Sequence, residues 1–319
     1  MTHHDKSDQS TAKALGPLAA YQLADVTKTR PQFGALTPRW LTKLLEFKAL
    51  PTGLYRVNRV LEGDTPLDAL CSQDPGRPQI PQGYVEYQTK PREHHLSSIS
   101  TIVNIDTKVA DLYSSPYDQA AEQLGLAIES LRERQESQII NNDDYGLLKN
   151  AVDTQRIKSR TGSPTPDDLD ELISKVWKEP SFFLAHPRAV AAFAREATRR
   201  GVPPATVNLA GGVFIQWRGI PLIPTDKLFV DGLKNPKGKT GKTNILLVRT
   251  GEAKRGVVGL YQANLPGDQS RGLAVRLRGV DENGLASYLL SLYCSAAILA
   301  DDALGVLEEV EVGNYYDYK

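Results

Sequence analysis

Apolar residues recur at helical spacing most clearly in the middle of the chain, after residue 163. The segment that opens S-P-T-P-D-D-L has an N-cap residue in Thr165 and a proline at the first helical position, Pro166. The apolar residues that follow recur three and four positions apart, which predicts one buried helix face. They are Leu169, Leu172, Ile173, Val176 and Trp177. We expect Pro180 to end this helix.

A second helix is predicted from Pro187 to about Ala197, with Gly201 as the residue that closes it. Short strand-like segments follow at residues 206–209, 213–217 and 219–224. Because proline cannot donate an amide hydrogen bond, Pro221 and Pro224 predict that the last of these is an edge strand or carries a bulge. Two helices followed by a small sheet predict a compact α+β unit.

The preceding part of the chain alternates between apolar and polar residues, which is typical of strands. Strands are expected at residues 54–60, 84–87 and 99–109. Residues 62–83 are rich in Pro, Gly, Asp and Gln, and a loop of this length is either functional or mobile. Ser115 and Pro116 predict the start of a long helix that would continue to Ile140 and span roughly 36 Å.

Both ends of the chain add further elements. The broken apolar segments at residues 12–24 and 37–47 have too little mass for a core of their own. We expect this arm to pack on another part of the chain or on another chain. Strands are predicted at residues 227–230, 244–249, 257–262, 273–277 and 304–312. A buried helix is predicted to begin at Asp281 and to continue to about Ala300.

Composition narrows the class of protein. The 319 residues include 38 basic and 38 acidic side chains, and a neutral chain is not a bulk binder of nucleic acid. The two cysteines, Cys71 and Cys294, fit a reducing compartment. The N-terminus shows no apolar signal segment, and the longest uncharged run, residues 284–300, is shorter than a membrane span. We therefore expect a soluble cytoplasmic protein with no membrane or nucleic-acid partner.

Candidate chemistry is sparse. The chain has no G-x-S-x-G, C-x-x-C or H-E-x-x-H pattern. The G-K-T-G-K-T turn at residues 238–243 lacks the earlier glycine of a phosphate-binding loop and precedes a predicted strand, so we interpret it as a solvated hairpin turn. His94 and His95 would point to opposite faces of a strand and make a poor metal site. We expect no catalytic, cofactor-binding or metal-binding residues and no enzyme activity.

Several long motifs together resemble one protein family. The chain resembles the shell protein of the second class of encapsulins (family 2A), in the sub-group that packages a cysteine desulfurase, over about residues 20–312. The motifs that carry the resemblance include Y-R-V-N-R-V, D-L-Y-S-S-P-Y-D-Q, P-T-P-D-D-L-D-E-L, V-W-K-E-P-S-F-F-L-A-H-P, W-R-G-I-P-L-I-P-T-D and S-L-Y-C-S-A-A-I-L-A-D-D-A-L. These motifs are long, and their combination is too rare to arise by chance.

The resemblance implies the Hong Kong 97-type phage major capsid protein fold, which is of the α+β class. The expected parts are an N-terminal arm at residues 1–50, an extended E-loop with its flanking strands at 51–111, a peripheral domain with the spine helix at 112–164 and 265–319, and an axial domain at 165–264. In that fold the axial tip lines the five-fold opening of the shell. The candidate pore loop is therefore Arg199, Arg200, Gly201 and Val202, although basic residues there also offset the helix dipole.

The function that the resemblance implies is assembly. The chain is expected to form an icosahedral nanocompartment of about sixty copies, with a cysteine desulfurase on its interior and pores that admit small molecules. Pyridoxal phosphate would belong to that enzyme, so no cofactor is expected in this chain. Two alternatives stay open: a prophage-type major capsid protein, which would hold DNA, and a soluble α+β enzyme of unknown class. The missing catalytic pattern argues against the enzyme, and the nearly end-to-end motif match argues against the capsid protein.

Overall fold

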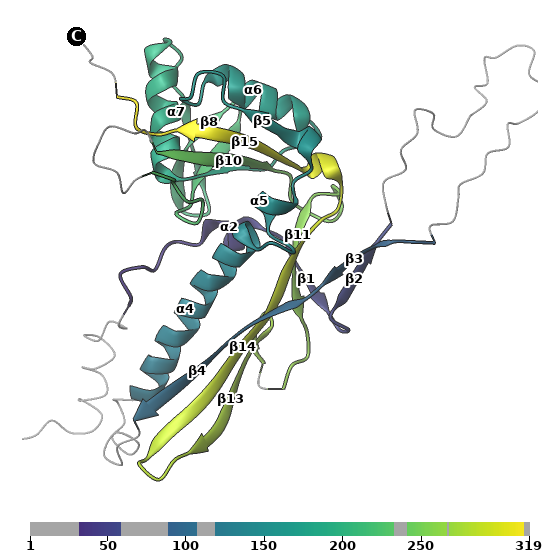
Figure 1. Ribbon diagram of the computed structural model, residues 1–319, viewed down its shortest axis with the longest axis vertical. Helices are drawn as coiled ribbons and strands as arrows, with labels where there is room; N and C mark the ends of the chain where they lie inside the picture. Colours follow the sequence, from purple (N-terminus) through teal and green to yellow (C-terminus); the bar gives the residue numbers. More distant parts are fainter. Residues whose placement is uncertain (1–31, 59–88, 107–118, 233–240, 267, 316–319) are drawn as a thin grey trace, which may run out of the picture.

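Two large β-sheets lie one above the other along the long axis of the computed structural model (Figure 1). The structure describes residues 32–58, 89–106, 119–232, 241–266 and 268–315. A two-stranded ribbon, β2 (Leu54–Val57) with β3 (Arg92–His95), projects to one side. Helices and strands are interspersed along the chain, which confirms the predicted α+β class.

The upper sheet separates two cores. Its strands run in the order β5 (Arg156–Lys158), β15 (Leu304–Glu311), β10 (Lys242–Val248), β6 (Phe182–Ala185), β9 (Ile220–Pro224), β8 (Gly212–Trp217) and β7 (Ala205–Leu209). Because successive strand residues face opposite sides, Phe183 packs with helices α6 (Pro166–Lys175) and α7 (Pro187–Arg199), whereas Phe182 and Leu184 pack against the elements below.

Helix α6 begins as the sequence predicts. The Thr165 hydroxyl accepts the Asp168 amide at 3.1 Å, and the Asp168 carboxylate accepts the Thr165 amide at 3.0 Å, so the two residues form a reciprocal capping box. The prediction for Trp177 is wrong, because its side chain is 68% exposed. The helix ends at Lys175, and the chain turns before Trp177 can join the buried face.

Strand β9 is not at the edge of the sheet, so the prediction made from its prolines is wrong. It lies between β6 and β8. Its two neighbours divide its length: β8 pairs with Ile220 and Pro221, and β6 pairs with residues 222–224. Neither ladder needs an amide from every residue of β9, which allows prolines inside the sheet.

The lower sheet is built around one long strand. Its order is β1 (Phe47–Leu50), β11 (Val257–Gln262), β14 (Leu285–Ile298), β13 (Leu273–Val280) and β12 (Asp268–Ser270), and β4 (Ser97–Asp106) also pairs with β14. The helix predicted from Asp281 to about Ala300 is therefore wrong. Strand β14 has neighbours on both edges and buried residues on both faces, and such an apolar run cannot be told from a buried helix by periodicity.

Helix α4 (Gln119–Asn141) is the predicted spine and lies alongside β4 and β14 (Figure 1). Leu131 is buried against the lower sheet, and Leu124 and Ile128 pack beside it, as the spacing predicts. The predicted start at Ser115 and Pro116 lies outside the described residues.

The described part of the N-terminal arm packs on its own chain. Helix α2 (Trp40–Leu44) places Leu41 in the central core with no exposed surface, and the Trp40 ring meets Phe214 edge-on at 5.1 Å. The Thr37 amide donates to Glu133 of α4 at 2.7 Å. The arm was expected to pack either on another part of its own chain or on another chain, and residues 37–50 pack on their own chain. Residues 12–24 lie outside the described part.

Three further predicted segments lie between the arm and strand β10 in the sequence. The predicted excursion at residues 62–83 and the strand at 84–87 lie outside the described residues. Residues 227–230 do not form the predicted strand. Lys227 is instead buried and forms ion pairs with Glu133 at 2.6 Å and Asp226 at 2.8 Å, and these pairs hold the segment against α4.

Two strands pair with partners outside their own expected domain range, and the domain ranges stay predictions. The range 165–264 for the axial domain includes β11, yet β11 pairs with β14 in the lower sheet. The range 265–319 for the peripheral domain includes β15, yet β15 pairs with β10 in the upper sheet. The chain therefore moves from one sheet to the other more than once. Hydrogen-bonding partners far away in the sequence decide the sheet to which each strand belongs.

Candidate functional site

The candidate pore loop closes helix α7. The Val202 amide donates to the Ala197 carbonyl at 2.9 Å, and the Gly201 amide donates to the Thr198 carbonyl at 3.0 Å. These two bonds form a Schellman motif. Gly201 has a φ of 77°, which glycine adopts without steric cost. The predicted closing role of Gly201 is therefore confirmed, and the loop is held by its own backbone.

A buried carboxylate lies beneath the two loop arginines. Glu196 is 1% exposed and accepts hydrogen bonds from Arg199 Nη2 at 2.8 Å and from Arg200 Nε at 2.7 Å. Arg200 also lies 3.5 Å from the Asp167 carboxylate of α6. These ion pairs offset the positive charge of the loop and restrain both guanidinium groups. Val202 remains half exposed beside them.

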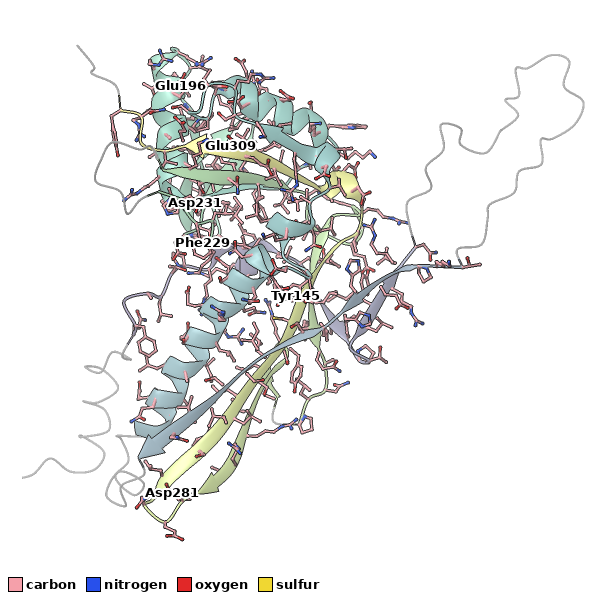
Figure 2. The ribbon with its side chains drawn as sticks, in the orientation of Figure 1. Tyr145, Glu196, Phe229, Asp231, Asp281 and Glu309 are labelled. Carbon is pink, nitrogen blue, oxygen red and sulfur yellow. The ribbon has the colours of Figure 1, made fainter. Side chains whose placement is uncertain are left out.

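Figure 2 shows Glu196 near one end of the long axis and Asp281 near the other. The turn that follows Glu196 therefore lies near the same end of the long axis, away from Asp281. The four predicted loop residues, Arg199, Arg200, Gly201 and Val202, form one exposed turn there. A pore exists only between several copies of the chain, so the assignment of this turn to a five-fold opening stays a prediction.

The Asp302 carboxylate is held by two basic side chains. Asp302 accepts a hydrogen bond from Arg249 at 2.6 Å and lies 2.9 Å from Lys178. Burial alone would raise the pKa of Asp302, but the hydrogen bonds from Arg249 and Lys178 outweigh burial and hold that pKa below its ordinary value. His94 is half-buried and His95 is exposed, as alternation along β3 predicts.

Within the described ranges, no cluster of three or more His, Cys, Asp or Glu side chains could hold a metal ion. No helix in those ranges is long and apolar enough to cross a membrane. Strand β10 begins at Lys242, which confirms the strand expected after the G-K-T-G-K-T turn, while residues 238–240 lie outside the described part.

The sequence interpretation missed a second group of basic side chains. Arg39, Lys43, Arg132 and Arg271 line a common cavity of about 300 Å³. They belong to the arm, the spine helix and the turn between β12 and β13. Each of them is an ordinary basic residue in its local sequence, so no motif joins them, and only the packing of three distant segments brings them together.

Comparison with known proteins identifies the family. The family described as "Type 2A encapsulin shell protein SrpI-like" matches residues 58–314. The type 2A encapsulin shell protein SrpI of Synechococcus elongatus is 52% identical over 313 residues, which are 98% of this chain and 99% of the relative. A type 2A encapsulin shell protein of Mycolicibacterium paratuberculosis is 53% identical over 313 residues, with the same coverage.

Comparison with solved structures points to the same family. The holo-SrpI encapsulin complex from Synechococcus elongatus has a TM-score of 0.80 and 52% identity, and the match covers 96% of this chain and 99% of that chain. The capsid of an empty GTA particle has a TM-score of 0.59 at 12% identity, and the match covers 92% of this chain and 98% of that chain. The structure of Microbacterium phage Oxtober96 has a TM-score of 0.56 at 10% identity, and the match covers 89% of this chain and 97% of that chain. The last two share only the fold, which confirms the predicted phage-capsid architecture. The chain belongs to the type 2A encapsulin shell protein family.

Proposed function

We propose that this chain assembles into a closed icosahedral shell in the cytoplasm and encloses a cysteine desulfurase. The observation that carries the proposal is the match to the holo-SrpI encapsulin complex, which covers 96% of this chain and 99% of that chain at 52% identity. A match of this extent supports the role of a shell subunit for the whole of this chain. Rotational contacts that close on themselves produce finite shells, here of about sixty copies.

The surface of a single chain also supports assembly. Several large apolar side chains are more than half exposed, and contacts between subunits would remove them from water. They are Phe33, Trp177, Val213, Phe229, Leu277, Val280 and Tyr315. Figure 2 shows Phe229 beside the end of the spine helix, far from the turn at Asp281, so more than one face of the chain would take part in contacts.

Sedimentation and electron microscopy of the purified protein test the shell. We expect uniform round particles that form without any added cofactor. A monomer or dimer at all salt and protein concentrations would contradict the proposal. Particles that retain DNA would favour the prophage-type capsid protein instead.

Co-expression tests the cargo separately. A cysteine desulfurase should co-elute with the shell and bring its pyridoxal phosphate absorbance, whereas an unrelated enzyme of similar size should not. If both enzymes are excluded from intact shells, the cargo assignment is wrong and the shell assignment stands.

We also propose that residues 199–202 line the five-fold opening and help to select what enters. Their place beside Glu196, near one end of the long axis, and the exposure of Val202 support this. A reconstruction of the assembled shell should show this turn around the five-fold axis. The same turn at a two-fold or three-fold contact would contradict the assignment.

A further inference from the structure

A basic cavity lies where the arm, the spine helix and the lower sheet meet. Its volume is about 300 Å³, and its lining contains Arg39, Lys43, Arg132 and Arg271. None of the described residues that line it is acidic. Gln135, which is 4% exposed, adds a buried amide to the wall. The cavity therefore concentrates positive charge in a place that is partly removed from solvent.

Two nearby carboxylates each already have a partner. Glu129 pairs with Arg39 at 2.7 Å, and Glu136 is engaged by the Thr42 amide at 3.1 Å. Burial lowers the pKa of Arg132, and the charges of Arg39 and Arg271 lower it further, while Glu129 acts in the opposite direction. The guanidinium groups are thus close enough to repel one another, and an anion between them would relieve that repulsion.

Two of the four basic residues have an unfavourable backbone conformation. Arg39 has φ 50° and ψ 55°, and Arg271 has φ 44°, which is the left-handed region that side chains other than glycine seldom adopt. Arg271 is followed by Gly272, where a Cβ atom would lie 2.7 Å from the Tyr293 carbonyl oxygen. The turn is therefore fixed by its neighbours and keeps Arg271 at the cavity. Strain of this kind often accompanies ligand binding.

We infer that this cavity binds a small tetrahedral oxyanion of the phosphate or sulfate type, free or as part of a small metabolite. Guanidinium groups match such oxyanions through paired, charge-assisted hydrogen bonds. The positive charge gathers around a cavity and not along an extended strip, which favours a small anion over an acidic peptide. The site is separate from the candidate pore loop and does not depend on the identity of the cargo.

Titration calorimetry with inorganic phosphate tests this site in the full-length assembled protein. The buffer should be Tris chloride at constant ionic strength, because buffers with a sulfonate group could compete. We expect one saturable site per chain, with sulfate as a competitor. Arg132→Gln and Arg271→Gln should each weaken phosphate binding by about tenfold, since each removes a charge-assisted hydrogen bond.

Arg278→Gln is the matched control. Arg278 is exposed, lies on β13 and does not line the cavity, so its substitution should leave phosphate affinity unchanged. Arg271 is also exposed, so its variant should keep the wild-type circular dichroism and sedimentation even if Arg132→Gln fails to fold. Binding that does not saturate, binding that survives Arg271→Gln, or no binding to intact shells would overturn the inference. The last result is also expected if a carboxylate of an adjacent subunit or of an acidic peptide fills the cavity.

Discussion

The Glu196 carboxylate is the residue that most directly restrains the candidate pore loop. It is buried, and it accepts hydrogen bonds from both Arg199 and Arg200. We expect Glu196→Ala to lower the free energy of unfolding by about 2 kcal/mol, because the two arginines lose a charged partner that is itself buried. Denaturant titration followed by tryptophan fluorescence measures this change.

Asp167→Ala is the control for that experiment. Asp167 contacts Arg200 as well, but its side chain is 72% exposed, so the substitution should change stability by only about 0.5 kcal/mol. Equal losses in the two variants would show that burial of the Glu196 carboxylate adds nothing to its role.

A second buried carboxylate makes stability depend on pH. Burial raises the pKa of Glu136 above its ordinary value of 4.5, although the Thr42 amide and the charge of Lys227 oppose the rise. Folding thus favours the protonated form. This contribution to stability is complete below pH 4.5 and is lost as the pH rises through the folded pKa.

We therefore expect Glu136→Gln to melt at a higher temperature than the wild type at neutral pH, with the difference shrinking as the pH approaches 4.5. Scanning calorimetry across this range measures the effect, and Glu129→Gln provides a comparison at a carboxylate that is less buried. A difference in melting temperature that stays constant with pH would contradict this origin.

Helix α7 begins with a histidine that caps it. His186 Nδ1 accepts the Arg188 amide at 3.1 Å, so that ring nitrogen must be unprotonated. Burial lowers the pKa of His186, and the charge of Arg188 lowers it further, while Asp226 opposes them. The cap is therefore complete above the ordinary pKa of 6.5, and its contribution to stability is lost as the pH falls through the lower folded pKa.

His186→Ala should cost about 1 kcal/mol at neutral pH, because the first turn loses an acceptor. His186→Asn should keep the cap and remove the pH dependence, since asparagine caps helices well and does not titrate. Melting curves of both variants in mildly acidic and neutral buffer test this. If the asparagine variant retains the wild-type pH dependence, His186 is not its source.

The junction between the spine helix and α5 (Leu147–Asn150) depends on the absence of a side chain at Gly146. A Cβ atom there would lie 2.3 Å from the Asn142 carbonyl oxygen, which belongs to backbone and cannot move aside easily. We expect Gly146→Ala to lower the free energy of unfolding by about 1–3 kcal/mol through this clash. Gly34→Ala is the matched control, because nothing lies within 4 Å of its Cβ position. Equal stability of the two variants in denaturant titrations would contradict the clash.

At the scale of the whole molecule, the N-terminal segment divides into a packed region and the region before it. Residues 40–50 are part of the central core and the lower sheet of the same chain, through Leu41, Leu45 and β1. Residues 1–36 precede that packed part, and the sequence predicts that their leucines pack on another part of the chain or on another chain. The two regions should therefore respond differently to truncation.

We expect deletion of residues 1–36 to leave a folded but poorly assembled protein, because each leucine buried on a neighbour contributes roughly 1.5–3 kcal/mol. Deletion of residues 1–50 should prevent folding. Circular dichroism and sedimentation velocity distinguish these results. Intact particles with unchanged heat resistance after the shorter deletion would contradict a role in assembly.

Local chemistry explains which elements could be predicted from the sequence. The N-cap at Thr165, the glycine closure at Gly201 and the helical spacing of α6 and α7 depend on residues only a few positions apart, and all three are present in the structure. The resemblance carried by long motifs predicted the family and the fold. The four residues of the candidate pore loop lie together because they are consecutive, and their role in a pore stays a prediction.

The tertiary structure decided whatever depends on distant partners. Strand β14 contains a helix-like repeat, but pairing with β4, β11 and β13 makes it a strand buried on both faces. The prolines of β9 lie inside a sheet because two neighbours divide its length. The basic cavity exists only where three segments meet. The sequence by itself determined the helix ends, the alternating strands and the family. The tertiary structure decided which strands pair and which basic side chains lie around one cavity. The interactions that decide pairing and clustering act between residues far apart in the chain, so no local pattern contains them.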